Sequence, residues 1–119
     1  MSLKSYKELV VWQKSMDLVV EIYKMTKQLP KFETYGLSSQ MQRASIAIPS
    51  NIAEGSQRGK KEYVRFLSIA KGSAAEIETQ IELVKRIYPN IGTQKTEELA
   101  DEVLKMLSAM IKKLQTPNL

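Results

Sequence analysis

Four basic side chains close together in the sequence offer the clearest chemistry, namely Arg58, Lys60, Lys61 and Arg65. Lys60 and Lys61 fall at the predicted start of a helix, where the helix dipole favours anions and opposes cations. No Ser, Thr, Asp or Asn directly precedes Lys60 as a cap, and Ser56 lies further back. A helix N-terminus flanked by basic side chains suits a bound phosphate. The alternative is a solvated charge run, which costs only about a few tenths of a kcal/mol.

Most enzymatic chemistry is excluded by two missing residue types. The chain contains no cysteine and no histidine, which excludes disulfides, thiolate zinc sites, cysteine nucleophiles, Ser-His-Asp triads and zinc sites of the HExxH type. Two acidic clusters are candidate ligands for a hard metal ion, and a metal-dependent nuclease is the corresponding hypothesis. Carboxylates on helix faces are usually solvated, so we predict no metal, no cofactor and no catalytic residue. The clusters are Glu76, Glu78 and Glu82, and Glu97, Glu98, Asp101 and Glu102.

The net charge points to a polyanionic partner. The 119 residues include 18 lysines and arginines against 13 aspartates and glutamates, a formal net charge of +5. Residues 1–72 hold 12 basic and 6 acidic side chains, whereas residues 73–119 hold 6 and 7. A basic protein without catalytic side chains is more often a binder than an enzyme, and nucleic acid is the expected partner.

Apolar spacing and the positions of glycine and proline predict four helices. The helical segments cover about 7–29, 36–54, 60–88 and 93–115. The third carries an uninterrupted heptad seam, and short connections make consecutive helices antiparallel. We therefore predict an all-α fold, an up-down antiparallel four-helix bundle with a kinked second helix, in a single domain of residues 1–119. The seam consists of Tyr63, Leu67, Ala70, Ala74, Ile77, Ile81, Val84 and Tyr88.

The kink is predicted from Pro49, which lies inside the second helical pattern. Proline has no backbone N–H, and its ring crowds the carbonyl of the residue four positions earlier, here Ser45. The backbone groups that are freed need new partners, which Ser45, Ser50 and Asn51 can supply. A kink shaped for packing is the favoured explanation.

The first segment carries more apolar surface than a small bundle covers. Its apolar side chains span roughly 220° of the helix, whereas a surface helix needs a stripe of little more than about 100°. One cluster fits the bundle core, and the other needs a second partner, which self-association supplies most simply. The alternative is a first helix that lies centrally within the monomer. One cluster contains Leu9, Trp12, Met16, Val19, Val20 and Tyr23. We assign the interface between subunits to the other, which contains Val11, Leu18, Ile22 and Met25.

The sequence shows no sign of a membrane segment or an export signal. No apolar run approaches the roughly 18–20 residues of a membrane span. The N-terminus, MSLKSYKELVV, lacks the apolar stretch and cleavage site of a signal peptide. We expect a cytoplasmic protein that has no membrane partner and no small-molecule substrate.

Three stretches of the chain resemble the 23S rRNA intervening-sequence protein family. They are LVVWQKSMDLVVEIY, YGLSSQMQRASIAIPSNIAEGSQR and FLSIAKGSAAEIETQIELV. The resemblance implies a four-helix bundle that assembles as a ring-like homopentamer. It also implies kinship to the accessory protein of diversity-generating retroelements, a basic pentamer that works with nucleic acid and a reverse transcriptase. Lys60 stands where many members of the family carry Ser or Thr, so the helix cap is weaker and the basic patch is stronger.

These observations predict a non-enzymatic homo-oligomer that presents a basic surface to nucleic acid, with structured RNA as the expected partner. Binding would be electrostatic, because lysine and arginine displace counterions from phosphates with little readout of the bases. The alternative is a protein-interaction scaffold without a nucleic-acid role, in which the basic charge serves only solubility.

Overall fold

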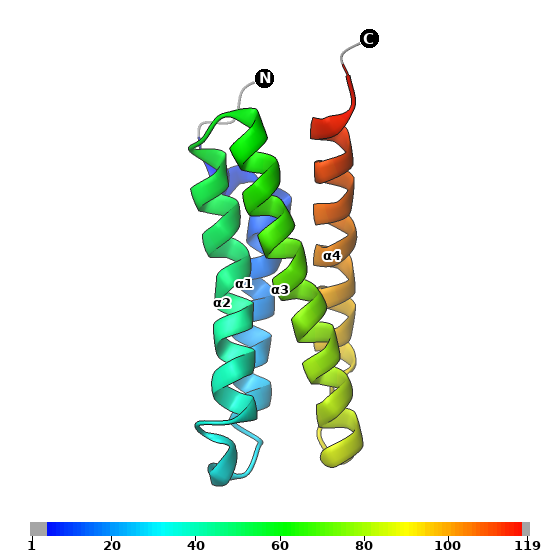
Figure 1. Ribbon diagram of the computed structural model, residues 1–119. Helices are drawn as coiled ribbons and strands as arrows, with labels where there is room; N and C mark the ends of the chain where they lie inside the picture. The colour runs from blue at the N-terminus through cyan, green and yellow to red at the C-terminus, as the bar shows by residue number, and fades with distance from the viewer. Residues whose placement is uncertain (1–4, 118–119) are drawn as a thin grey trace.

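The chain folds into four long helices that run along a common axis (Figure 1). The computed structural model describes residues 5–117, and no strand occurs among them. Short 3-10 helices precede the first long helix and link it to the second. The predicted all-α fold is confirmed, and each helix begins close to its predicted position. The elements are η1 (Tyr6–Glu8), α1 (Val10–Thr26), η2 (Lys31–Glu33), α2 (Leu37–Ser56), α3 (Lys60–Ile87) and α4 (Gln94–Gln115).

Each long helix packs against two neighbours, which closes the bundle. α1 contacts α2 and α4, and α3 also contacts α2 and α4. The connections lie at alternate ends in Figure 1, so consecutive helices run antiparallel. The folded chain measures 51 × 21 × 21 Å, and a cluster of buried side chains from all four helices forms its core. The predicted up-down four-helix topology is confirmed.

The heptad seam of α3 lies in the core, as predicted. Its central members are buried and its two terminal tyrosines, Tyr63 and Tyr88, are partly buried. On α4, the buried apolar residues are Ala100, Val103 and Leu107. The buried members of the α3 seam are Leu67, Ala70, Ala74, Ile77, Ile81 and Val84.

The assignment of Val11, Leu18, Ile22 and Met25 to an interface between subunits is wrong. All four side chains lie in the core of the single chain and are between 0 and 2% exposed. They form the face of α1 that is covered within the bundle, where α1 contacts α2 and α4. A side chain that is already covered by its own chain has no surface left for a second subunit.

The other apolar cluster of α1 is the one that faces outward. We call it the outer strip of α1. Met16, Val20 and Tyr23 are exposed, at 41, 52 and 39%. An open groove of about 330 Å³ runs between this strip and α2, and Ile46 and Pro49 line its α2 side. α1 therefore carries two apolar clusters, of which one is covered within the bundle and the other lies on the outer side of the helix. The outer strip consists of Leu9, Trp12, Met16, Val19, Val20 and Tyr23, of which Leu9 and Trp12 are partly buried and pack against the core.

α2 continues through Pro49 as one helix, and the side chain of Pro49 is buried. Ser45 and Asn51 bond backbone carbonyls of α2, but not the carbonyl of Ser45 that Pro49 leaves without its helical donor. The Ser45 hydroxyl donates to the carbonyl of Gln42 at 2.9 Å, and the Asn51 amide donates to the carbonyl of Ala47 at 2.7 Å. The kink itself stays a prediction.

The connection between α1 and α2 is held in place by Glu33. One carboxylate oxygen of Glu33 accepts a hydrogen bond from the backbone N–H of Leu37 at 3.2 Å, at the start of α2. The other accepts a hydrogen bond from the hydroxyl of Tyr88, which follows α3. A Cβ atom at Gly36 would lie only 3.0 Å from Glu33 Oε1, so glycine leaves room for this carboxylate. Glu33 therefore ties the connection to two other parts of the fold.

The Tyr88–Glu33 hydrogen bond predicts a stability change at high pH. The bond to the carboxylate raises the pKa of Tyr88 from 10.0 to about 12. As the pH rises, the Tyr88 hydroxyl therefore loses its proton in the unfolded chain before it does so in the folded chain. The contribution of the hydrogen bond to the free energy of unfolding is complete below pH 10.0 and disappears as the pH rises to about 12. Tyr88→Phe removes the bond, and urea denaturation should show a stability deficit that shrinks across this range. A deficit that stays constant through this range would contradict the assignment.

Candidate nucleic-acid interface

A short connection between α2 and α3 brings the predicted basic residues to one end of the bundle. The backbone N–H of Gln57 donates to the carbonyl of Glu54 at 3.3 Å, and that of Arg58 donates to the carbonyl of Gly55 at 3.0 Å. Gly59 then precedes Lys60, the first residue of α3. The predicted helix start at Lys60 is confirmed. Four basic residues therefore lie on or beside two adjoining helix ends.

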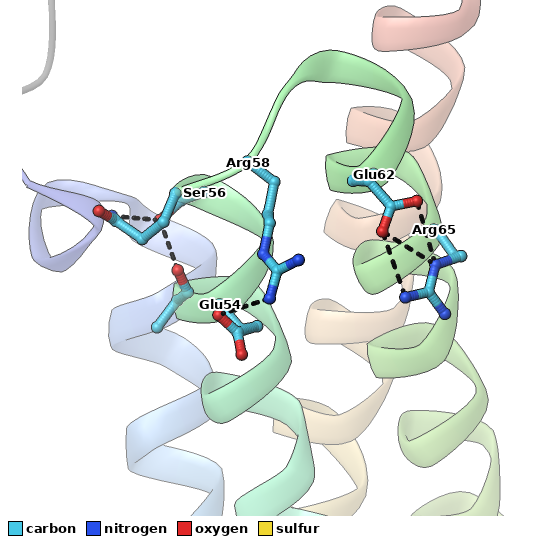
Figure 2. Close-up of polar contacts among 7 residues, drawn as sticks. Glu54, Ser56, Arg58, Glu62 and Arg65 are labelled. Atoms are coloured by element: carbon cyan, nitrogen blue, oxygen red, sulfur yellow. Dashed lines mark hydrogen bonds and ion pairs between the residues drawn. The ribbon is translucent and has the colours of Figure 1, made fainter.

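The two arginines of the cluster are held by exposed ion pairs on neighbouring helices (Figure 2). Nη2 of Arg58 lies 3.5 Å from Oε2 of Glu54, and Nη2 of Arg65 lies 3.3 Å from Oε1 of Glu62. Both pairs are exposed, and pairs of this kind stabilise a fold by at most about 1 kcal/mol. An incoming phosphate can therefore compete for either arginine at small cost.

Both guanidinium groups also contact the ring of Phe66. The Cζ atoms of Arg58 and Arg65 lie 5.2 and 4.9 Å from the ring centroid, within the range of cation–π attraction. Gly55 makes this arrangement possible, because a Cβ atom there would lie 2.7 Å from the Cβ of Phe66. Phe66 thus brings together two predicted site residues from different elements. Phe66 was not predicted as part of the site, because the approach of α2 to α3 is a tertiary contact.

Lys60 and Lys61 take no part in these ion pairs and cation–π contacts. Both are exposed in the first turn of α3, and α3 has no side-chain cap. Neither forms an ion pair with any residue that the structure describes, since the nearby Glu62 pairs with Arg65. Two unpaired cations at a helix N-terminus interact unfavourably with the positive end of the helix dipole. A bound anion would interact favourably with both the lysines and the dipole.

Further basic residues join the cluster at the same end of the bundle. η1, the α2–α3 connection and the last turn of α4 come together there (Figure 1), around an open, mainly apolar groove of about 470 Å³. Lys113 lines this groove, and Lys112 precedes it in the last turn of α4. We call this region the basic end. Its cations are Lys7, Arg58, Lys60, Lys61, Arg65, Lys112 and Lys113.

Several lysines nearer the middle and the opposite end of the bundle are neutralised by carboxylates. Nζ of Lys14 lies 3.4 Å from Oε1 of Glu102, and Nζ of Lys105 lies 2.9 Å from Oδ2 of Asp101. Lys95 lies 3.3 Å from Glu21. At the basic end, the two lysines at the start of α3 have no such partner among residues 5–117.

A comparison with known families decides which family this bundle comes from. The family described as 23S rRNA-intervening sequence protein matches residues 7–112. This match runs from η1 through most of α4. The chain belongs to the 23S rRNA-intervening sequence protein family. The resemblance seen in the sequence is thereby confirmed, and it extends into α4.

A solved structure of similar fold supports the same family. It is a protein of unknown function from the S23 ribosomal protein family of Bacteroides thetaiotaomicron. The two chains share 28% sequence identity with a TM-score of 0.76, over 87% of this chain and 99% of the other. No curated protein matches the chain. Both matches point to the same family and the same four-helix fold.

The acidic clusters of α3 and α4 are partly engaged in ion pairs. Lys85 lies 3.8 Å from Glu82 and 3.2 Å from Glu97. A hydrogen bond from the Thr93 hydroxyl lowers the pKa of Glu97, and the ion pair with Lys85 acts in the same direction. Within residues 5–117, no group of three or more acidic side chains is arranged to hold a metal ion. None of the helices in this range is long and apolar enough to cross a membrane.

Proposed function

We propose that this protein is a non-enzymatic homo-oligomer of the cytoplasm that binds structured RNA through its basic end. The observation that carries the proposal is the pair of unpaired lysines, Lys60 and Lys61, in the uncapped first turn of α3. Backbone N–H groups at a helix start and nearby lysines together form a favourable site for a phosphate.

The proposed mechanism is electrostatic. Lysine and arginine side chains neutralise phosphates and release the counterions condensed on the nucleic acid, which makes affinity fall steeply with salt. Arg58 and Arg65 are already positioned by Phe66, so they lose less side-chain freedom when they exchange a carboxylate for a phosphate. Contacts of this kind position the partner and carry little sequence information.

RNA is favoured over DNA by the name of the family, which associates its members with intervening sequences of 23S rRNA. The S23 ribosomal protein family of the structural neighbour points in the same direction. The competing proposal is a protein-interaction scaffold, in which the same charges only keep the protein in solution.

Self-association is proposed to occur through the outer strip of α1. Met16, Val20 and Tyr23 leave a continuous apolar region uncovered, and such regions on soluble proteins usually mark interfaces. The family resemblance implies a pentameric ring. In a ring, every subunit repeats the basic end, so individually weak phosphate contacts add up by multivalency.

Replacing Arg58, Lys60 and Lys61 together by alanine should weaken RNA binding and flatten its salt dependence. We expect the wild type to bind structured RNA at micromolar concentration or tighter in low salt. The slope of log K against log salt should fall by about 0.9 for each phosphate that the variant no longer neutralises. A filter-binding titration at two or more salt concentrations measures both quantities. The fold should be unchanged, because all three side chains are exposed.

A matched control separates the position of the charges from their number. Replacing Lys71, Lys95 and Lys105 by alanine removes the same charge from exposed positions away from the basic end, and it should leave most of the affinity intact. Equal salt slopes for the wild type and the basic-end variant would show that this cluster is not the site. No binding by the wild type in low salt would favour the scaffold proposal.

A further inference from the structure

Two aromatic side chains are displayed at the end of the bundle opposite the basic end. Tyr35 is 95% exposed and Phe32 is 78% exposed, which makes them the most exposed large hydrophobic side chains among residues 5–117. They lie three residues apart in the connection between α1 and α2. Burial normally stabilises rings of this size strongly, so two neighbouring rings that are this exposed offer a surface for a partner.

The exposure results from the way this connection is built. Glu33 lies between the two aromatic residues in the sequence. Its carboxylate accepts hydrogen bonds from the start of α2 and from Tyr88. The backbone N–H of Thr34 donates to the carbonyl of Lys31 at 3.0 Å, and its hydroxyl donates to the same carbonyl at 2.7 Å. The rings of Phe32 and Tyr35 are therefore presented by a hydrogen-bonded turn. Neither ring contacts another aromatic ring in the part of the chain that the structure describes.

Unpaired cations accompany the two rings. Lys27 and Lys31 are exposed and form no ion pair with a described residue. The one carboxylate of the connection, that of Glu33, is already occupied by its two hydrogen bonds. Lys24, one turn before Lys27, is paired with Glu21 at 3.4 Å. The turn thus combines exposed aromatic faces with free positive charge.

We propose that Phe32 and Tyr35 stack on the unpaired bases of single-stranded RNA, while Lys27 and Lys31 contact its phosphates. This inference rests on the proposed function for the class of partner and adds a second site with a different preference. Aromatic faces beside lysines are how proteins hold unpaired strands, because every base has a face to stack and every nucleotide carries a charge. Duplex RNA fits poorly, since its base faces are already stacked on one another.

The preference for unpaired RNA is tested with a fluorescent oligouridine, which forms no duplex, in an anisotropy titration of the full-length protein. Tyr35→Ala and Phe32→Ala should each weaken binding by about fivefold to 150-fold, the range seen when a stacking side chain is removed. Their salt slope should match that of the wild type, because no charge is removed. Lys31→Ala should instead flatten the slope by about 0.7, the value for one phosphate of a single strand.

Two control variants distinguish the loss of base stacking from a general loss of exposed apolar surface. Tyr35→Phe retains the ring and should bind like the wild type. Ile87→Ala removes a 54% exposed apolar side chain at the end of α3 and should leave the affinity unchanged. The proposal would be overturned if Tyr35→Ala and Phe32→Ala bound oligouridine as tightly as the wild type does. It would also be overturned if the wild type did not bind oligouridine in low salt.

The two proposals fail in different ways. If the basic-end variant keeps its full affinity for structured RNA while Tyr35→Ala no longer binds oligouridine, the basic end is not an RNA-binding site. The connection that carries Phe32 and Tyr35 is then the RNA-binding site. If Tyr35→Ala instead loses binding to vesicles of phosphatidylcholine and phosphatidylserine and keeps its affinity for oligouridine, the turn is a membrane contact and the stacking proposal is wrong.

Discussion

Replacing Ile77 by alanine is expected to lower the free energy of unfolding by about 2–5 kcal/mol, the usual range for a buried large-to-small change. Ile77 is 0% exposed and lies near the middle of the α3 seam, between the buried residues Ala74 and Ile81. Alanine at this position removes apolar surface from the core and leaves a cavity that the surrounding helices fill only in part. Urea denaturation at a fixed protein concentration measures the change and keeps any contribution from assembly constant.

The matched control for this change is Ile87→Ala on the same helix. Ile87 is 54% exposed, so its truncation should change stability by no more than about 0.5 kcal/mol, as is typical of surface positions. A loss below about half a kcal/mol for Ile77→Ala itself would mean that Ile77 does not lie in the core. Similar losses for both variants would mean that the seam does not separate buried from exposed positions.

The proposed self-association through the outer strip of α1 predicts that Met16→Asp is a monomer of 13.5 kDa. Met16 belongs to the outer strip of α1 and is 41% exposed in the single chain. An aspartate there remains hydrated in the monomer, whereas in an interface it would become a buried and unpaired charge, which costs several kcal/mol. Light scattering at micromolar concentration should give the wild type a mass several times that of the variant.

Gln40→Asp is a suitable control for the added charge. Gln40 is exposed near the start of α2, does not line the groove beside the outer strip, and lies where the helix dipole favours a carboxylate. This variant should keep the wild-type mass. A wild type with the mass of a monomer would contradict self-association, and an unchanged mass for Met16→Asp would exclude the outer strip as the interface.

The number of helices, their approximate limits and the buried face of α3 are all predictable from the order of the amino acids. These features follow from local rules. Glycine and proline interrupt the helical pattern, and a repeat of apolar residues every three or four positions predicts one buried helix face. The start of α3 at Lys60 and its missing side-chain cap were also predictable, because both depend only on adjacent residues. Arg58, Lys60, Lys61 and Arg65 could therefore be identified from sequence alone, whereas Lys7, Lys112 and Lys113 join them only through the packing of η1 and α4 at the same end.

Which of the two apolar faces of α1 is covered depends on how the four helices pack together. Both clusters of α1 are apolar, and sequence contains no local signal that separates Leu18, which is fully buried, from Val20, which is 52% exposed. The contacts of Phe66 with Arg58 and Arg65 also required the close approach of α2 and α3 at Gly55. The connection that carries Tyr35 is bound through Glu33 to Tyr88, a residue distant in sequence. Each of these features is a contact between distant parts of the chain, and the periodicity of one helix does not specify its neighbour.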